Sequence, residues 1–259
     1  MNTPAHSPSS RSHWVIWLSL AAMAILVASH ARADDLKLVF TPTWNGQPIQ
    51  VNHWIPDAAP AGRSVSEIRF LLSRPSVQHE DGTWQTIRDA FALIDLADGK
   101  TATTTLRGLK AESITGIRFD VGVPPTENGA DLPTLDASHP LNPATCVLKL
   151  ANQPGYTFIS LAGLWRQEDG QLGQFQYQLA GDPYIARVEL PVKPGTSDSN
   201  RLHIAFDAAV AVADFDPKRM SAVKSHPALT TFSFNVRKAF KLIENDKQSA
   251  PSTFTLSQN

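Results

Sequence analysis

Histidine, cysteine and methionine are the side chains in this sequence that could bind a metal ion. Imidazole, thiolate and thioether groups are donors that transition metals such as zinc and copper accept in proteins. Five histidines follow residue 33: His53, His79, His139, His203 and His226. No two of them are two or four residues apart, so local geometry alone brings no pair together. A metal site would therefore have to be assembled from distant loops.

His53 and His139 are the favoured candidate ligands, because both stand in long irregular segments. Cys146 is the sequence's one cysteine, and Met220 with His226 forms a weaker third candidate group. Each of these candidate ligands also has a purely structural interpretation. A lone cysteine is most often simply buried, a methionine most often fills a gap in the core, and a single histidine is usually not a ligand.

Recognisable catalytic motifs are absent from the sequence. It contains no nucleophile elbow, no His-Glu-x-x-His, no glycine-rich phosphate loop and no Cys-x-x-Cys. We therefore predict no catalytic residues and no enzymatic activity. The 23 basic and 24 acidic residues give a formal net charge of −1, which is not the balance of a nucleic-acid-binding protein.

Residues 1–33 have the features of a secretory signal peptide. A basic lead precedes an apolar run over residues 14–29, and Ala31-Arg32-Ala33 matches an Ala-x-Ala cleavage site. An uncleaved membrane anchor is the alternative, but the run is shorter than the roughly 20 residues that span a bilayer. We expect cleavage after Ala33, a mature protein that begins at Asp34, a periplasmic location and no membrane association afterwards.

The mature chain predicts a single all-β domain over residues 34–246. Short runs rich in β-formers are separated by turn pairs such as Asn45-Gly46 and Asp81-Gly82. This pattern predicts an antiparallel sandwich or open barrel of seven to ten strands, with Phe119, Phe158, Tyr177 and Phe206 buried. The runs cover residues 36–41, 66–73, 91–96, 116–122, 156–165, 174–179, 186–192 and 201–210.

One C-terminal helix is expected over residues 234–245, with Phe234, Ala239, Phe240 and Ile243 near one face. The polar tail, residues 247–259, is predicted to be disordered. The longest irregular segments are 45–64, 122–145, 193–200 and 211–231. Because loops held on a rigid scaffold carry most binding sites, function is expected there.

Several sequence blocks follow one another in a characteristic order. They are FTPTWNGQPI (40–49), SEIRFLLSRPSV (66–77), DGTWQTIRDAFALIDLADG (81–99), GIRFDVGVP (116–124), HPLNP (139–143) and PGYTFISLAG (154–163). In this order the blocks resemble those of the MbnP-type periplasmic copper-binding proteins, which include methanobactin-associated proteins and the four-cysteine proteins of metallo-mystery pairs. The resemblance runs from Leu36 to about Leu242.

The resemblance implies an exported β domain that binds copper and acts with a dihaem cytochrome c peroxidase-like (MauG-like) partner. In relatives, that enzyme oxidises a tryptophan that takes part in the copper site. Here we expect any such modification at Trp54, because it adjoins His53 in an irregular segment. Trp44 and Trp84 abut hairpin turns and are expected to pack.

This chain departs from the family pattern at the expected ligand positions. Gly129 stands where the family's Asn-His-x-Asp element has its histidine, and Gln178 replaces the histidine of a later Phe-x-Tyr-His-Leu-Gly element. A Met-x-Trp-x-Trp segment is replaced as well, by Leu148, Leu150 and Asn152. Two functions stay open: copper binding through another ligand set, or a β module that kept the scaffold, lost the copper ligands and binds a non-metal ligand or a protein.

Overall fold

The computed structural model describes residues 35–56, 62–97, 102–109, 113–129, 135–151, 154–167, 169–193 and 200–243. All of them belong to one compact unit, residues 35–259. The predicted signal peptide and the polar tail from residue 247 lie outside the described residues. Within the described part, no helix has the length and apolar character needed to cross a membrane.

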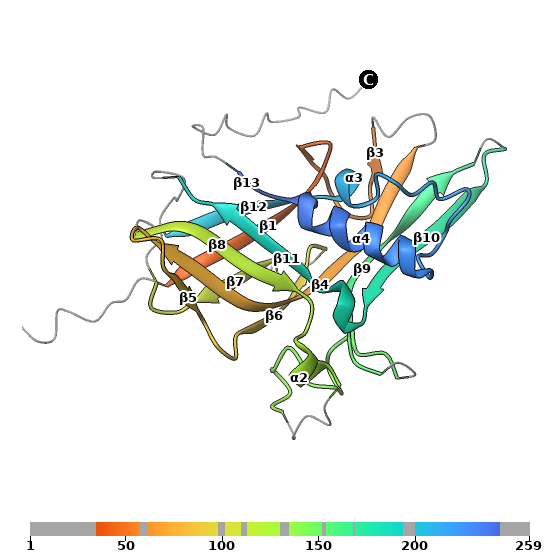
Figure 1. The fold of residues 1–259 in the computed structure, drawn as a ribbon. Coiled ribbons are helices and arrows are strands. Elements are labelled where there is room, and N and C mark those ends of the chain that lie inside the picture. Colours follow the sequence, from red (N-terminus) through yellow and green to blue (C-terminus); the bar gives the residue numbers. More distant parts are fainter. Residues whose placement is uncertain are drawn as a thin grey trace, which may run out of the picture. The chain divides into compact units, whose positions relative to one another are not determined.

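Two β-sheets form the domain (Figure 1). In the first sheet the strand order is β13-β12-β1-β2, and β7 also pairs with β1. Its strands are β1 (Leu36–Trp44), β2 (Gln47–Pro48), β7 (Thr103–Leu106), β12 (Arg201–Asp207) and β13 (Phe240–Leu242). The Asp207 carboxylate accepts hydrogen bonds from the backbone N–H groups of Asn45 and Gly46, so it holds the β1–β2 turn against the end of β12.

The second sheet is organised around the long strand β4, with the order β10-β9-β4-β8-β11. Three short strands, β3, β5 and β6, also pair with β4. The strands are β3 (Trp54–Ile55), β4 (Arg63–His79), β5 (Trp84–Thr86), β6 (Phe91–Asp95), β8 (Ile114–Val121), β9 (Thr157–Arg166), β10 (Leu172–Ala180) and β11 (Ala186–Pro191).

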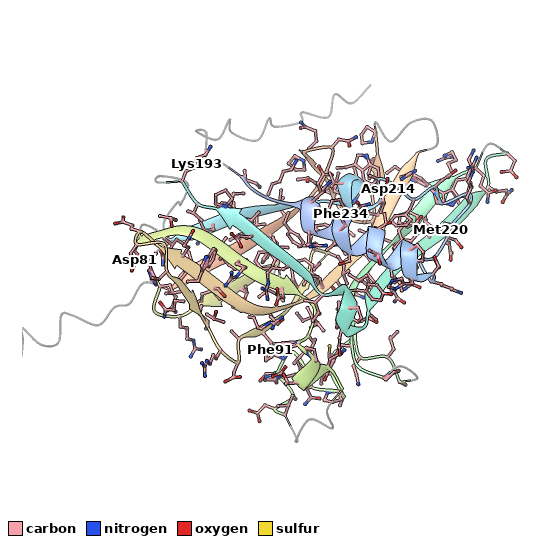
Figure 2. All side chains as sticks on the ribbon, viewed as in Figure 1. Asp81, Phe91, Lys193, Asp214, Met220 and Phe234 are labelled. Carbon is pink, nitrogen blue, oxygen red and sulfur yellow. The ribbon has the colours of Figure 1, made fainter. Side chains whose placement is uncertain are left out.

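Among the described residues, the helices are short except for one. They are α2 (Pro125–Asn128), the 3-10 helix η2 (Asp182–Tyr184), α3 (Ala208–Ala211) and α4 (His226–Ala239). Helix α4 buries Phe232 and Val236 and packs against α3 and β11. Phe234 lies on its exposed side (Figure 2).

The main core lies between the two sheets, and we call it the inner cluster. Its centre is a group of phenylalanines in edge-to-face and stacked contacts that joins β1 and β12 of the first sheet to β4 and β8 of the second. Alternation along a strand sends successive side chains to opposite faces. Phe70 and Leu72 of β4 therefore enter the inner cluster, while Leu71 faces the other side of the sheet.

The predicted fold class is confirmed, and each of the eight expected segments contains a strand, although residues 208–210 of the last segment belong to α3. The four aromatic residues expected in the interior are buried: Phe119, Phe158, Tyr177 and Phe206. One pairing was not expected: β1 and β12 run parallel, with Leu38 opposite Leu202. Five short strands were also missed, each of four residues or fewer.

The prediction of the C-terminal helix was wrong in its bounds. Helix α4 begins at His226 and ends at Ala239, and Phe240 already belongs to β13, which pairs with β12. Phe234 and Ile243, expected on the buried face, are exposed, whereas Ala239 and Phe240 are buried. The predicted irregular segment 211–231 therefore includes the first turns of the helix.

Candidate functional site

The described parts of the long segment after β8, residues 122–129, 135–151 and 154–156, pack against the outer face of the second sheet. There they build a second apolar group, which we call the outer cluster: Leu71, Val123, Leu141, Cys146, Leu148, Tyr156 and Phe158. Leu71 and Phe158 come from β4 and from β9, and the other members come from the segment itself. The loop that interrupts the strand pattern after residue 122 is thus packed through its apolar residues onto the sheet.

Asn128 and Tyr156 fasten this segment. The Asn128 side chain accepts a hydrogen bond from the Tyr156 backbone N–H (2.8 Å) and donates one to Asp182 of η2 (2.7 Å). The Tyr156 hydroxyl donates to the Leu141 carbonyl. Gly155 has a φ of +80°, and a Cβ there would lie 2.5 Å from the side-chain Oδ1 of Asn128. Only glycine therefore fits this close approach.

The positions that we expected to correspond to family ligands lie at one end of β9. Gly129 follows Asn128, which bonds to Tyr156, and Leu148 accepts a hydrogen bond from the N–H of Thr157, the first residue of β9. Gln178 pairs with Ser160, and its Nε2 lies 3.5 Å from Ser160 Oγ. Ser160 shares a strand face with Phe158 of the outer cluster. Gln178 therefore points to the side of the sheet that the loop covers.

The structure does not bring together His53 and His139, the two favoured candidate ligands. His53 precedes β3, which pairs with β4 at Ser64, while the His139 ring packs against Phe91, which pairs with β4 at Ser73. At about 3.3 Å per residue, these points are roughly 30 Å apart along β4. One ion cannot bind both side chains at that separation.

The remaining candidate ligands have structural partners. Cys146 is 6% exposed within the outer cluster, and burial raises the pKa of its thiol, which disfavours the thiolate that a metal requires. The Met220 side chain packs against the inner cluster, and the Tyr177 hydroxyl donates to its carbonyl. His226 Nδ1 is hydrogen-bonded to the Tyr184 hydroxyl. Phe91, next to α2, and Met220, beside β10, lie in two separate regions of the domain (Figure 2).

These residues do not fit a copper centre. Among the described residues, no three or more histidine, cysteine, aspartate or glutamate side chains gather as a metal site would require. The three positions expected to correspond to family ligands supply a glycine, a leucine and an amide, and an amide oxygen is a hard donor that suits copper poorly.

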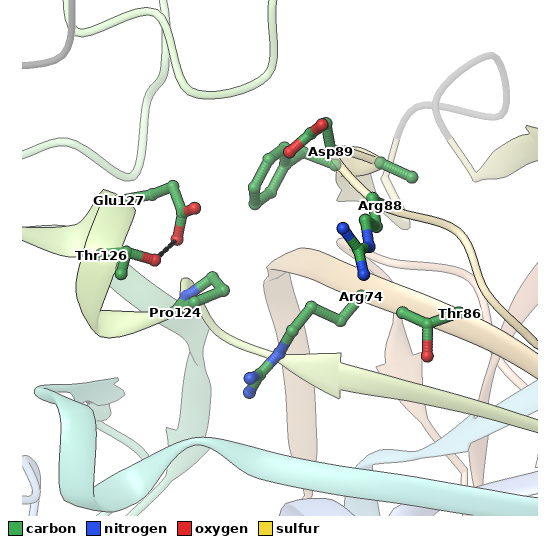
Figure 3. A pocket seen from close by; sticks show the side chains of 9 residues that line it. Arg74, Thr86, Arg88, Asp89, Pro124, Thr126 and Glu127 are labelled. Atoms are coloured by element: carbon green, nitrogen blue, oxygen red, sulfur yellow. Dashed lines mark hydrogen bonds between the residues drawn. The ribbon is translucent and has the colours of Figure 1, made fainter.

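A pocket of about 310 Å³ opens between β4, β6 and α2, next to the outer cluster (Figure 3). Sequence reasoning missed it. Four of its side chains are charged: Arg74, Arg88, Asp89 and Glu127. Phe91, whose ring also contacts His139, forms an apolar part of the wall.

A buried carboxylate lies beneath this pocket. Asp120 on β8 is 1% exposed and is ion-paired with two guanidinium groups, those of Arg74 and Arg187. The hydrogen bond from Arg187 Nε to Asp120 (2.9 Å), together with the charge of that carboxylate, raises the pKa of Arg187. Since one carboxylate neutralises one guanidinium, the group keeps a surplus of positive charge.

Together, the fold and the site define a two-sheet β domain whose outer face is covered by a long loop. A family model described as MbnP matches residues 33–226, and the chain belongs to that family. Its fold is similar to that of MbnP from Methylosinus trichosporium, with a TM-score of 0.52 and 13% identity over 75% of this chain and 81% of that one. No curated protein sequence matches significantly.

Proposed function

We propose that this chain is an exported binding protein of the MbnP family that recognises a non-metal ligand or partner and holds no copper at the family's ligand positions. The supporting observation is the composition of one region. Gly129, Leu148 and Gln178 lie at the same end of β9, yet none of them carries an imidazole, thiolate or thioether. The chain therefore has the family's fold without copper-binding side chains at these three positions.

Copper competition tests this function. Mature protein recovered from the periplasm, with an intact mass that begins at Asp34, should not withdraw copper from a chromophoric chelator. Weak residual binding should fall independently in His53→Ala and His139→Ala, because the two side chains are too far apart to share an ion. Tight binding by the parent that survives both changes would overturn the proposal.

A second candidate function is redox partnership with a dihaem cytochrome c peroxidase-like enzyme, and one observation favours it. Trp54 is 40% exposed, whereas Trp44 and Trp165 are 8% and 7% exposed. The Arg166 guanidinium lies 5.0 Å from the centre of the Trp54 ring, and Arg118 lies 4.3 Å from that of Trp84. Of the four tryptophans that the structure describes, Trp54 is thus the most accessible to an oxidising partner.

Co-expression with such a peroxidase should change the mass of the Trp54 peptide and leave the peptides of the other tryptophans unchanged. The partner enzyme supplies the oxidant, and ring exposure selects the residue. Peptide mass spectrometry measures the change, with Trp54→Phe as the control that should remain unmodified. Modification of Trp84 with an intact Trp54 would contradict this candidate.

A further inference from the structure

Side chains of both signs of charge line the pocket between β4, β6 and α2, and Asp89 stands beside Arg88 in the turn before β6. Arg74 and Arg88 come from β4 and from the turn before β6, and Glu127 comes from α2 across the opening (Figure 3). In the same view the Glu127 carboxylate faces the Asp89 side, with the Arg88 guanidinium below. Its volume of about 310 Å³ lies at the lower end of the range for small-molecule sites.

The backbone at Arg74 holds this residue in an unusual conformation. Five described residues other than glycine have a positive φ; three are asparagines, and the other two, Arg74 (+49°) and Asp89 (+54°), both line this pocket. Aspartate tolerates this region, but a long side chain that precedes a proline rarely adopts it. Arg74 lies where the β4–β8 register shifts, between Ser73 and Ser76. Such strain concentrates at functional sites.

The pocket also has a defined wall. The backbone N–H of Ile87 donates to the Pro75 carbonyl (2.8 Å), which ties the segment carrying Arg88 and Asp89 to β4. Phe91 is half-buried and offers an aromatic surface between the charged groups. Glu127 is hydrogen-bonded to the neighbouring Thr126 hydroxyl, which orients its carboxylate.

We propose that this pocket binds a free amino acid as a zwitterion. Its carboxylate contacts the guanidinium groups of Arg88 and Arg74, where Asp120 leaves positive charge in surplus. Its ammonium group lies between the carboxylates of Glu127 and Asp89, and its side chain packs on Phe91. The inference rests on the proposed non-metal binding function and names its ligand class.

Isothermal titration calorimetry with three matched probes tests the assignment. L-Phenylalanine carries both charges, 3-phenylpropanoate lacks the ammonium group, and phenethylamine lacks the carboxylate. Because each missing charge leaves charged groups of the pocket unpaired, each analogue should bind roughly tenfold more weakly or worse. Equal binding of the three probes, or no binding of L-phenylalanine, would overturn the proposal.

Two variants assign the groups. Arg88→Gln should weaken the binding of L-phenylalanine and leave the binding of phenethylamine unchanged. Glu127→Gln should weaken the binding of L-phenylalanine and leave the binding of 3-phenylpropanoate unchanged. The exposed Arg107→Gln and Glu80→Gln, which lie outside the pocket, are matched controls and should bind L-phenylalanine as the parent does. Variants that behave like these controls would refute the site.

Copper competition on the same sample separates this inference from the proposed function. Tight copper binding would defeat the proposed function whatever the amino-acid result. Absent copper binding together with absent L-phenylalanine binding would defeat only the ligand assignment.

Discussion

Replacing Phe240 with alanine should lower the free energy of unfolding by about 3–5 kcal/mol, the usual cost of deleting a buried phenylalanine ring. Phe240 is 3% exposed and stands at the start of β13. Its ring contacts four others, two from each sheet: Phe40, Phe206, Phe70 and Phe119. Removing it opens a cavity where the two sheets meet, so the loss is larger than that of the ring's transfer energy alone.

Urea denaturation of the mature protein measures the effect, and Phe234→Ala is the matched control. Phe234 lies on α4, the helix that precedes β13, and is 47% exposed, with the Lys238 ammonium group 4.0 Å from its ring centre. Its loss should cost less than about 0.5 kcal/mol, as for most surface substitutions. Similar losses of unfolding free energy in the two variants would instead support the sequence-based prediction that Phe234 and Phe240 lie on one face of a helix.

Local patterns explain why the strands could be predicted and the end of the helix could not. Alternating apolar side chains mark each long strand, because that signal arises within a few residues. Phe240 leaves the helix to pair with Phe206 of β12, a contact 34 residues away in the chain. The start of α4 did carry a local signal that was overlooked, since Ser225 occupies the N-cap and Pro227 lies in the first turn.

The sequence predicted which loop contributes to the candidate site, but it did not predict the pocket itself. The run of prolines and polar residues after Val121 indicated a loop of functional interest, and that loop forms the outer cluster and one side of the pocket. The pocket itself depends on non-local pairing: Asp120 binds Arg74 and Arg187, which are 46 and 67 residues distant in sequence. No spacing pattern in the sequence predicts the irregularity in the β4–β8 pairing, between Ser73 and Ser76, at which Arg74 lies.

Introducing histidine at both replaced positions, Gly129→His with Gln178→His, should tighten copper binding by at least roughly tenfold. The loss of a residue that only hydrogen-bonds to a metal ligand already lowers metal affinity by about that factor, so a restored ligand should gain no less. Both positions lie at the same end of β9 on the side covered by the loop. A Cβ at Gly129 would meet no atom within 4 Å, and its φ of −101° suits any residue. Gln178 is half-exposed, so an imidazole replaces it without crowding the core.

The paired alanine variant, Gly129→Ala with Gln178→Ala, changes the same backbone positions without adding donors, so its copper affinity should equal that of the parent. The chelator competition used for the parent measures all three proteins. A gain in the histidine pair alone means that this scaffold still places two imidazoles within reach of one ion, and that the loss of those side chains accounts for the lost metal chemistry. An unchanged affinity would mean that Gly129 and Gln178 do not occupy the family's ligand positions.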